Sequence, residues 1–413
     1  MSAGLLGFVF QVVISHRVQP AEYGAIFAVM TLLTLVGLPA SALTLMMARE
    51  ASRDRAAGQR AASAAMLHDG NRILLLGGVG IAALAIIASP FLSRFFAVAV
   101  DFLIAGSVGL PFVLALPLLI GDLQGEQRFA AFSSMAFAQA AFKLAAAVGL
   151  GIVFGAVGII LGLSLGSAMS YALAHFLLRR QLAIKARWRW QRPAIAYLGI
   201  LLPSTLALAV LLSADVLLVK HFFSPRPAGE YAAVVALSRA LYYAAAGVAI
   251  VLFPKVVFHE SRGTSGSFLV WLSVGIVIGG GAAGLVLLTV SSGFLLRAFA
   301  GSAYAGGAPY LPWYGIGMTL LGAAGVLIAT HQSRGRRDFL AVLIPLAVLE
   351  PVAILLFHQT LRQVVQVVDV CMLASVIGLA VLYAAQRPAV RKPIVSLEAP
   401  QPVSSEPAME AIS

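Results

Sequence analysis

Long apolar runs constrain this chain more than any other feature. A helix needs about 20 apolar residues to cross a bilayer, and a segment in lipid must satisfy its backbone hydrogen bonds internally. The runs are too long and too evenly apolar for the alternating strands of a membrane β-barrel. Only 11% of the 413 residues are charged, against about 25% in typical soluble proteins. We therefore predict an all-α polytopic membrane protein with about twelve transmembrane helices, at residues 3–15, 24–47, 72–92, 102–121, 129–153, 156–178, 195–219, 229–253, 268–290, 308–330, 339–357 and 366–385.

The distribution of Lys and Arg predicts the side of the membrane on which each loop lies. With the N-terminus in the cytoplasm, 20 of the 28 basic residues fall on the cytoplasmic side, 6 fall outside, and Lys143 and Arg239 fall within spans. Such an excess is typical of cytoplasmic loops, so we expect both termini in the cytoplasm. The bias also explains the net charge of +12 without a nucleic-acid partner. We interpret the basic, Trp-containing stretch Arg187–Trp190 as lying on anionic membrane lipids, although such a stretch also suits the stacking of nucleic-acid bases.

The sequence contains an internal repeat of about half its length. Glu22-Tyr23 follows the first span and Glu230-Tyr231 follows the seventh, at an offset of 208 residues. A weaker echo pairs residues 125–129 (GEQRF) with residues 335–339 (GRRDF) at an offset of 210. Because each half holds six spans, an even number, the halves share one orientation, as in the parallel repeats of transporters.

The repeat and the basic stretch between the sixth and seventh spans define the predicted domains. We expect an N-terminal six-helix lobe at residues 1–180, a cytoplasmic linker at 181–194, a C-terminal six-helix lobe at 195–386 and a disordered cytoplasmic tail at 387–413. The first span is too short to cross a bilayer alone. We therefore expect the natural first helix to begin upstream of Met1.

Four stretches carry a family resemblance. P-A-E-Y-G at residues 20–24 follows the short first span, and GDLQGEQRF at 121–129 joins the fourth and fifth spans. DVLLVKHF at 215–222 ends the seventh span, and LFPK at 252–255 ends the eighth. Together they resemble polysaccharide-repeat-unit flippases, the Wzx-like branch of the multidrug/oligosaccharidyl-lipid/polysaccharide (MOP) exporter superfamily, whose signature L-x-P-E-x-Y-G is similar to residues 20–24. The short first span departs from the family's pattern.

The resemblance implies a fold like that of multidrug and toxin extrusion (MATE) transporters, with two six-helix lobes around a central cavity in a bacterial cytoplasmic membrane. It implies a flippase that moves a polyprenyl-diphosphate-linked oligosaccharide for O-antigen or exopolysaccharide biosynthesis by alternating access. The implied partners are the lipid-linked oligosaccharide, membrane lipids, a polysaccharide polymerase and its chain-length machinery. The alternative is a cation-coupled small-molecule exporter of the same superfamily. A membrane-embedded glycan polymerase fits less well, because the sequence has no large outer loop.

The residues themselves do not predict an enzyme. The seven His have no metal-ligand spacing, and the sequence holds neither a P-loop lysine motif nor a G-x-S-x-G elbow. The single cysteine, Cys371, excludes an internal disulfide and a Cys-based metal site. We therefore expect no catalytic residues, no metal and no cofactor.

Two basic residues inside spans are the main candidates for binding a substrate, because a charge in lipid is costly unless it faces a cavity or a partner. Arg239 lies in the eighth span with Tyr242 nearby, and Lys143 lies in the fifth with Gln139 one turn earlier. A diphosphate suits an Arg fork or a Lys point charge, and tyrosines suit sugars. Each cation is alternatively a structural partner of a buried acid, and Lys143 alternatively snorkels to the interface.

Two acidic residues inside spans are candidates for ion coupling. Glu350 precedes Pro351 in the eleventh span, and Asp215 lies late in the seventh. Glu350 is alternatively the buried partner of a basic residue. For Asp215, we favour a local structural pair with Lys220, five residues later. We expect Asp369 to be a span-end residue without a role.

Small residues in the sixth span predict close helix packing. Gly158, Gly162 and Gly166 repeat at intervals of four residues, and Ser170 continues the stripe. Small residues at this spacing let helix backbones approach closely, and we expect packing within the molecule rather than dimerisation. Pro203 marks a place where the seventh span is able to bend.

Overall fold

The computed structural model describes residues 2–58, 60–184, 192–261, 267–334 and 336–385. Within these ranges the chain is helical and contains no strand, which confirms the all-α prediction. The helices are α1 (Ser2–Ser15), α2 (Pro20–Ala56), α3 (Arg60–Phe96), α4 (Val100–Ser107), α5 (Leu110–Gly125), α6 (Phe129–Leu177), α7 (Arg179–Leu182), α8 (Arg192–Leu211), α9 (Ala214–Phe222), α10 (Pro225–Ser261), α11 (Ser267–Val290), α12 (Ser292–Ala300), the 3₁₀ helix η1 (Ser302–Tyr310), α13 (Leu311–Ser333), α14 (Leu340–Leu356) and α15 (Leu361–Ala385).

The predicted spans are helical over nearly their whole lengths. In the described part of the chain, nine helical segments are long and apolar enough to cross a membrane, and α1 and α14 are shorter apolar helices. Helix α6 has 49 residues and holds two predicted spans, because its backbone bends at Gly155, where φ is 60° and ψ is −141°. Two other spans are interrupted, at residues 108–109 between α4 and α5 and at 212–213 between α8 and α9.

The two arms of α6 lie against each other as an antiparallel hairpin. A Cβ atom added to Gly166 would lie 2.6 Å from the Cα atom of Lys143. A Cβ atom added to Gly162 would clash with the backbone of Ala147, and one added to Gly158 would clash with the backbone of Leu150. The numbers of the facing residues rise on one arm as they fall on the other, as an antiparallel pair requires. The glycine stripe therefore packs within the molecule, as predicted.

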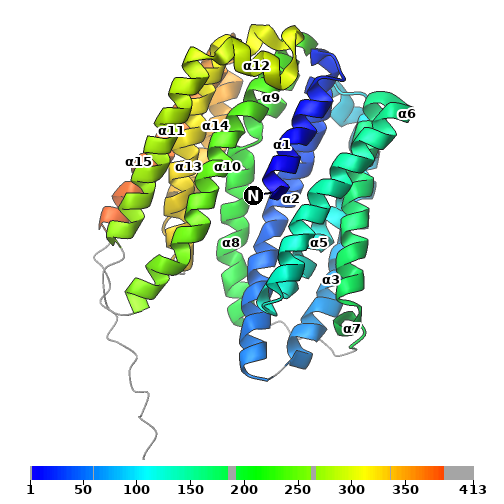
Figure 1. Ribbon diagram of the computed structural model, residues 1–413, viewed down its shortest axis with the longest axis vertical. Helices are drawn as coiled ribbons and strands as arrows, with labels where there is room; N and C mark the ends of the chain where they lie inside the picture. The colour runs from blue at the N-terminus through cyan, green and yellow to red at the C-terminus, as the bar shows by residue number, and fades with distance from the viewer. Residues whose placement is uncertain (1, 59, 185–191, 262–266, 335, 386–413) are drawn as a thin grey trace, which may run out of the picture.

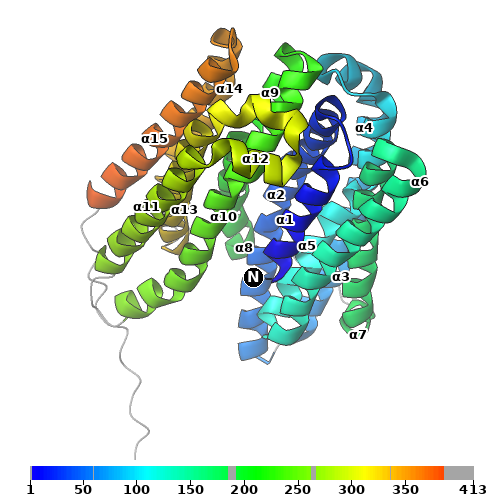
Figure 2. The same cartoon turned by 45° about the horizontal axis from the view of Figure 1, so that its top comes forward.

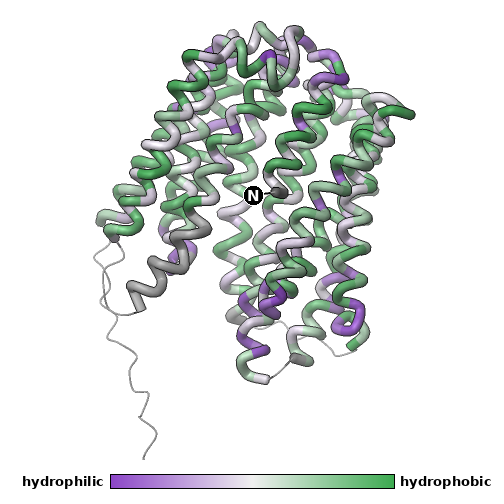
Figure 3. The backbone as a smooth tube through the Cα atoms, viewed as in Figure 1, coloured by the Kyte–Doolittle hydropathy of each residue, from purple (hydrophilic) through white to green (hydrophobic). Residues whose placement is uncertain are grey.

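The helices form two groups that run along the long axis of the molecule (Figure 1). Helices α1 to α7 lie on one side and α10 to α15 on the other, with α8 between them. In the first group α5 packs against α2, α3 and α6, and in the second α13 packs against α10, α11 and α15. Polar residues gather toward the ends of the helices and apolar residues along them (Figure 3). This arrangement suits a membrane around the middle of the molecule.

The groups follow the two halves of the sequence, but the exact domain boundaries stay a prediction. Most of the linker stretch, residues 185–191 with Arg187–Trp190, lies outside the described residues. The tail at 387–413 also lies outside them.

The two copies of the repeat meet where α2 crosses α10. A Cβ atom added to Gly24 would lie 3.0 Å from the Cα atom of Gly229, and one added to Gly229 would clash with the carbonyl group of Pro20. Only glycine permits this approach. The weaker echo also occupies equivalent places, because Phe129 begins α6 and Phe339 immediately precedes α14.

The halves are also joined at the end of the molecule that holds the α1–α2 turn (residues 16–19), which we call the upper end. There α12 lies across the molecule next to α1 (Figure 2). The hydroxyl group of Ser15 donates to the carbonyl group of Phe299 at 2.9 Å, and that of Tyr304 donates to the carbonyl group of Val18 at 3.0 Å. The opposite, lower end holds the α2–α3 turn, and there Arg49 of α2 lies over the ring of Tyr197 of α8 at 4.5 Å.

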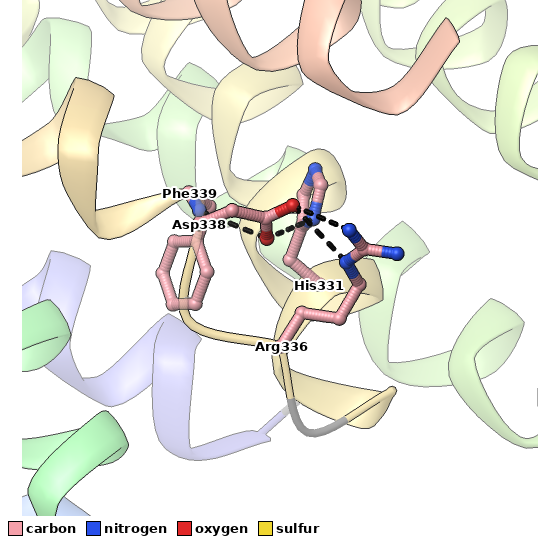
Figure 4. A network of polar contacts seen from close by, with 4 residues as sticks. All are labelled: His331, Arg336, Asp338 and Phe339. Carbon is pink, nitrogen blue, oxygen red and sulfur yellow. Dashed lines mark hydrogen bonds and ion pairs between the residues drawn. The ribbon is translucent and has the colours of Figure 1, made fainter. Parts of the chain in front are cut away.

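A polar network fixes the lower end of the second group (Figure 4). Arg336 donates two hydrogen bonds to Oδ2 of Asp338, at 3.1 and 2.8 Å. Oδ1 of Asp338 accepts a hydrogen bond from the amide of Phe339 at 3.1 Å and lies 3.7 Å from Nδ1 of His331. Burial acts to raise the pKa of Asp338, but the hydrogen bonds and charge of Arg336 outweigh it and hold this pKa below its ordinary value. The network joins the end of α13 to the start of α14.

Candidate functional site

A break in the seventh span positions the first acidic residue of the site. Helix α8 ends at Leu211 and α9 begins at Ala214, and Ser213 between them has φ −131° and ψ −29°. Asp215 therefore lies in the first turn of α9. Interrupted helices in membrane transporters commonly line binding sites, because the break exposes backbone groups and helix ends. Pro203, where we expected a bend, lies a full two turns before the break.

Two tyrosines hold Asp215. The hydroxyl groups of Tyr231 on α10 and Tyr314 on α13 donate to Oδ2 of Asp215 at 2.7 and 2.8 Å. The two rings meet edge to face, with centroids 5.7 Å apart. Asp215 is 0% exposed, and its Oδ1 atom has no hydrogen-bond partner among the described residues. The favoured pair with Lys220 is wrong for this structure, since no ion pair joins these two described residues and Asp215 pairs with tyrosines instead.

Glu350 lies close to this group on α14. It is 0% exposed, and neither carboxylate oxygen finds a hydrogen-bond partner in the described part of the chain. Its charge lies within electrostatic reach of Asp215. Two buried carboxylates without cationic partners are costly when both are ionised. The pair is therefore suited to take up a proton or a small cation, although the described residues contain no group of three or more His, Cys, Asp and Glu that would hold a metal.

Arg239 lies where the two halves meet. Its side chain on α10 is 9% exposed and donates a hydrogen bond to the carbonyl group of Leu212 at the break between α8 and α9. The guanidinium carbon lies 5.5 Å from the ring centroid of Phe27 on α2, and Nε has no partner among the described residues. No ion pair between described residues joins Arg239 to Asp215 or Glu350, although Asp215 is within electrostatic reach. Its charge is therefore incompletely compensated.

Tyr242, the tyrosine predicted to contact sugars, lies one turn after Arg239 on α10. It is half-buried and within electrostatic reach of Arg239. Its ring packs edge to face on Tyr243, with centroids 5.3 Å apart. Tyr242 and Arg239 thus share one region of α10.

Lys143 and Gln139 belong to the other half. Both are half-buried on the first arm of α6, and the backbone of Lys143 packs against Gly166. No hydrogen bond or ion pair within the described residues joins Lys143 to Arg239. The structure thus brings Arg239, Asp215 and Glu350 into one region and leaves Lys143 and Gln139 apart from it.

The sequence analysis missed one polar residue of this region, Tyr314, and misplaced another polar residue, Asp369. Tyr314 lies 99 residues from Asp215 in sequence, and a tyrosine inside an apolar span gives no local signal of such a contact. Asp369, expected at a span end, lies two turns inside α15, which begins at Leu361. Its Oδ1 atom is buried without a partner among the described residues and lies beside Gly317 of α13. The only signal was the aspartate itself within an apolar run.

Comparisons with known proteins address the fold. No protein-family model matches the sequence, and no curated protein matches it. Solved structures do match over nearly the whole chain. The chain is similar to the inward-facing conformation of a multidrug resistance MATE family transporter of the MOP superfamily, with a TM-score of 0.73, 15% identity, and coverage of 93% of this chain and 96% of that one.

Two further structures extend the comparison. The lipid II flippase MurJ, in an inward closed conformation, matches with a TM-score of 0.67 and 13% identity over 92% of this chain and 86% of that one. The outward-facing conformation of a multidrug resistance MATE family transporter matches with a TM-score of 0.60 and 14% identity over 95% of this chain and 93% of that one. The chain therefore has the MATE-like fold of multi-pass membrane transporters and flippases. These neighbours are transporters or flippases, not enzymes.

Proposed function

We propose that this protein is a flippase that carries a polyprenyl-diphosphate-linked oligosaccharide across the bacterial cytoplasmic membrane by alternating access. The observation that carries the proposal is Arg239, a buried cation at the meeting of the two halves without a carboxylate ion pair among the described residues. An anionic cargo provides the missing compensation, because a diphosphate in a low-dielectric interior needs positive charge nearby. The resemblance at residues 20–24 and the fold shared with a lipid II flippase support a lipid-linked cargo.

The residues of the region divide into three roles. Arg239 binds the diphosphate through its fork of N–H donors, and Tyr242 contacts the sugars. Lys143 and Gln139 serve the cargo at a second position in the other half. Asp215 and Glu350 bind the coupling proton or cation.

The higher TM-score to an inward-facing structure, 0.73, than to an outward-facing one, 0.60, supports an inward-facing state. At the upper end Ser15, Tyr304 and the Gly24–Gly229 crossing join the halves. Twenty of the basic residues lie toward the predicted cytoplasmic side, which corresponds to the lower end. With the cytoplasm at that end, the closed upper end faces outward. Reporter fusions after Arg192 and Ala389 should then behave as cytoplasmic, and one after Pro227 as external.

A second candidate function is a cation-coupled exporter of small molecules. The buried carboxylates of Asp215 and Glu350, which form no ion pair among the described residues, favour it, as does the likeness to multidrug transporters. The two candidates differ in cargo. Under the exporter, cells that lack the protein gain drug sensitivity and keep their surface polysaccharide. A polysaccharide polymerase and chain-length machinery are partners only of the flippase.

The test measures export and membrane abundance together in cells that depend on this protein for surface polysaccharide. We expect Arg239→Ala to abolish export at normal abundance, and Arg239→Lys to recover only part of it because the bidentate fork is lost. Arg297→Ala is the matched control, since Arg297 is exposed on α12 and, among the described residues, donates its hydrogen bond to Gly293 of its own helix. Normal export by Arg239→Ala at normal abundance would contradict the assignment of the cargo site.

A further inference from the structure

A cavity separate from the carboxylate region lies between α1 and α6 at the upper end. Its volume is about 160 Å³. Most of its walls are apolar, and two charged residues, one basic and one acidic, also line it. The lining residues are Val13, Ile14, Arg17, Val18, Glu22, Ala147, Val148, Gly151, Gly155, Ala156 and Ile159.

The polarity of the cavity changes along its length. Arg17 belongs to the turn between α1 and α2, and Glu22 belongs to the first turn of α2. Ala147, Val148 and Gly151 belong to the membrane-embedded first arm of α6. The cavity is therefore charged toward the membrane surface and apolar toward the membrane interior. A membrane lipid has this same polarity, from headgroup to acyl chain.

Two glycines help to keep the space open. Gly151 has no side chain to fill the cavity, and a Cβ atom added there would lie 2.8 Å from the side chain of Ile159. Gly155 sits at the bend between the arms of α6, with φ of 60°. This conformation favours glycine, and it turns the chain so that Ala156 and Ile159 of the second arm also line the cavity.

The two charged residues are available to a ligand. Arg17 and Glu22 are both exposed, and no hydrogen bond or ion pair of either side chain occurs among the described residues. Glu22 lies within electrostatic reach of the hydroxyl group of Tyr304. Opposite charges that line one cavity without pairing match a headgroup that carries both signs. Arg17 suits a phosphate, and Glu22 suits an ammonium group.

We propose that this cavity binds a phosphatidylethanolamine molecule, with its phosphate on Arg17, its ammonium group on Glu22 and a segment of acyl chain between α1 and α6. The volume is sufficient for the acyl segment, because an apolar protein cavity of about 150 Å³ accepts benzene, while the headgroup lies against the exposed side chains of Arg17 and Glu22. Phosphatidylglycerol fits less well, since it offers Glu22 no cation. The site lies apart from Arg239, so the inference does not depend on the proposed cargo.

Native mass spectrometry of the purified full-length protein tests the proposal. Phosphatidylethanolamine and phosphatidylglycerol of the same acyl chains are titrated separately into the detergent-solubilised protein. We expect one phosphatidylethanolamine per chain at low lipid, with phosphatidylglycerol bound about tenfold more weakly because one charge contact is missing. Equal binding of the two lipids would overturn the proposal, as would the absence of any retained lipid.

Variants locate the lipid. Arg17→Gln with Glu22→Gln removes both exposed charges and should abolish the preference for phosphatidylethanolamine. Ala156→Leu narrows the cavity and should lower retention at least fivefold. Gly149→Leu is the matched control, because Gly149 is an exposed position on the same helix and a Cβ atom there meets nothing within 4 Å. If Gly149→Leu lowered retention as much as Ala156→Leu, or if the double charge variant kept its preference, the lipid would be bound elsewhere.

Discussion

The two halves use equivalent tyrosines for different chemistry. Tyr23 and Tyr231 are the paired residues of the repeat, and each hydroxyl group donates to the first span of its own half. In the first half the acceptor is the neutral Gln11 at 2.9 Å. In the second half it is the buried carboxylate of Asp215 at 2.7 Å. The duplicated framework thus keeps the donor and changes the acceptor.

The fifth span of each half, residues 129–153 in the first and 339–357 in the second, also carries a different charged residue. Lys143 lies 14 residues after Phe129, and Glu350 lies 11 residues after Phe339, the equivalent phenylalanine. The two positions are therefore within about one turn of each other along the helix, and they carry opposite charges. Lys143 therefore places a cation in the first half, whereas the equivalent region of the second half holds the acid Glu350, near Asp215. A duplicated scaffold thus gives its two halves different ligand-binding chemistry through substitutions at a few positions inside the spans.

Replacing the acceptors of the paired tyrosines, Asp215 and Gln11, should lower export by different amounts. Asp215→Asn should lower export about tenfold or more, within the range of typical coupling energies, because it removes the carboxylate charge that we propose binds the coupling ion. Gln11→Leu should lower it less than about twofold, because it removes a neutral hydrogen bond. Export per unit of protein in the membrane is the measurement. Equal losses in the two variants would mean that the halves do not differ in ion coupling.

Alanine substitutions at the two glycines where the halves cross should lower the stability of the protein by different amounts. Gly229→Ala forces a methyl group against the carbonyl group of Pro20, whereas Gly24→Ala meets Gly229 at 3.0 Å. Overpacking typically costs about 1–3 kcal/mol, and we expect about 3 kcal/mol for Gly229→Ala and about 1 kcal/mol for Gly24→Ala. Thermal unfolding in detergent measures both. Gly149→Ala, where nothing lies within 4 Å, is the control, and a Gly229→Ala protein as stable as this control would contradict the close crossing.

Phenylalanine substitutions at the paired tyrosines, Tyr23 and Tyr231, should also lower the stability by different amounts, with a smaller difference than at the glycines. A hydrogen bond to a charged group contributes about 1.5–3 kcal/mol and one between neutral groups about 1 kcal/mol. Tyr231→Phe should therefore destabilise the protein more than Tyr23→Phe in the same unfolding assay. In an Asp215→Asn background, Tyr231→Phe and Tyr23→Phe should lower the stability by similar amounts, because both hydrogen bonds then join neutral groups. If Tyr23→Phe were the more destabilising change in the wild-type background, the contrast between Gln11 and Asp215 would fail.

The loops of the weaker echo should differ slightly in how they change stability with pH. In these loops Asp338 of the second half aligns with Arg128 of the first. The pKa of Asp338 is lower in the folded protein than its ordinary value. Its ionised form therefore stabilises the fold above the unfolded-state pKa, and this contribution is lost as the pH falls through the folded-state pKa. Asp338→Asn should flatten the acid side of the stability profile. Arg128→Gln should leave the shape of the acid side of the stability profile unchanged. If neither variant changed that shape, Asp338 would not be the source of the acid dependence.

The fold was predictable from the sequence because lipid imposes a simple rule on each segment separately. Hydropathy located the spans, and the stripe from Gly158 to Gly166 indicated close packing within the molecule. The site was harder, because its contacts join distant segments. The free-energy cost of placing a charge inside an apolar span identified Asp215, Glu350 and Arg239 as unusual residues. No local sequence pattern linked Tyr314 to Asp215. The break at residues 212–213 carries no proline or glycine, and tertiary contacts such as the bond from Arg239 accompany it instead.

The hairpin of α6 has a consequence for how the protein is made. Only Gly155 departs from helical geometry between the two arms, so almost no loop separates them during membrane insertion. A lysine at the centre of a single inserting helix costs about 2.5–3.5 kcal/mol, which makes the arm with Lys143 a weak candidate to enter lipid alone. The arm that follows is rich in apolar and small residues and packs its Gly166 directly on Lys143. The two arms are therefore expected to leave the ribosome-bound translocon as a pair, the second helping the first into the bilayer.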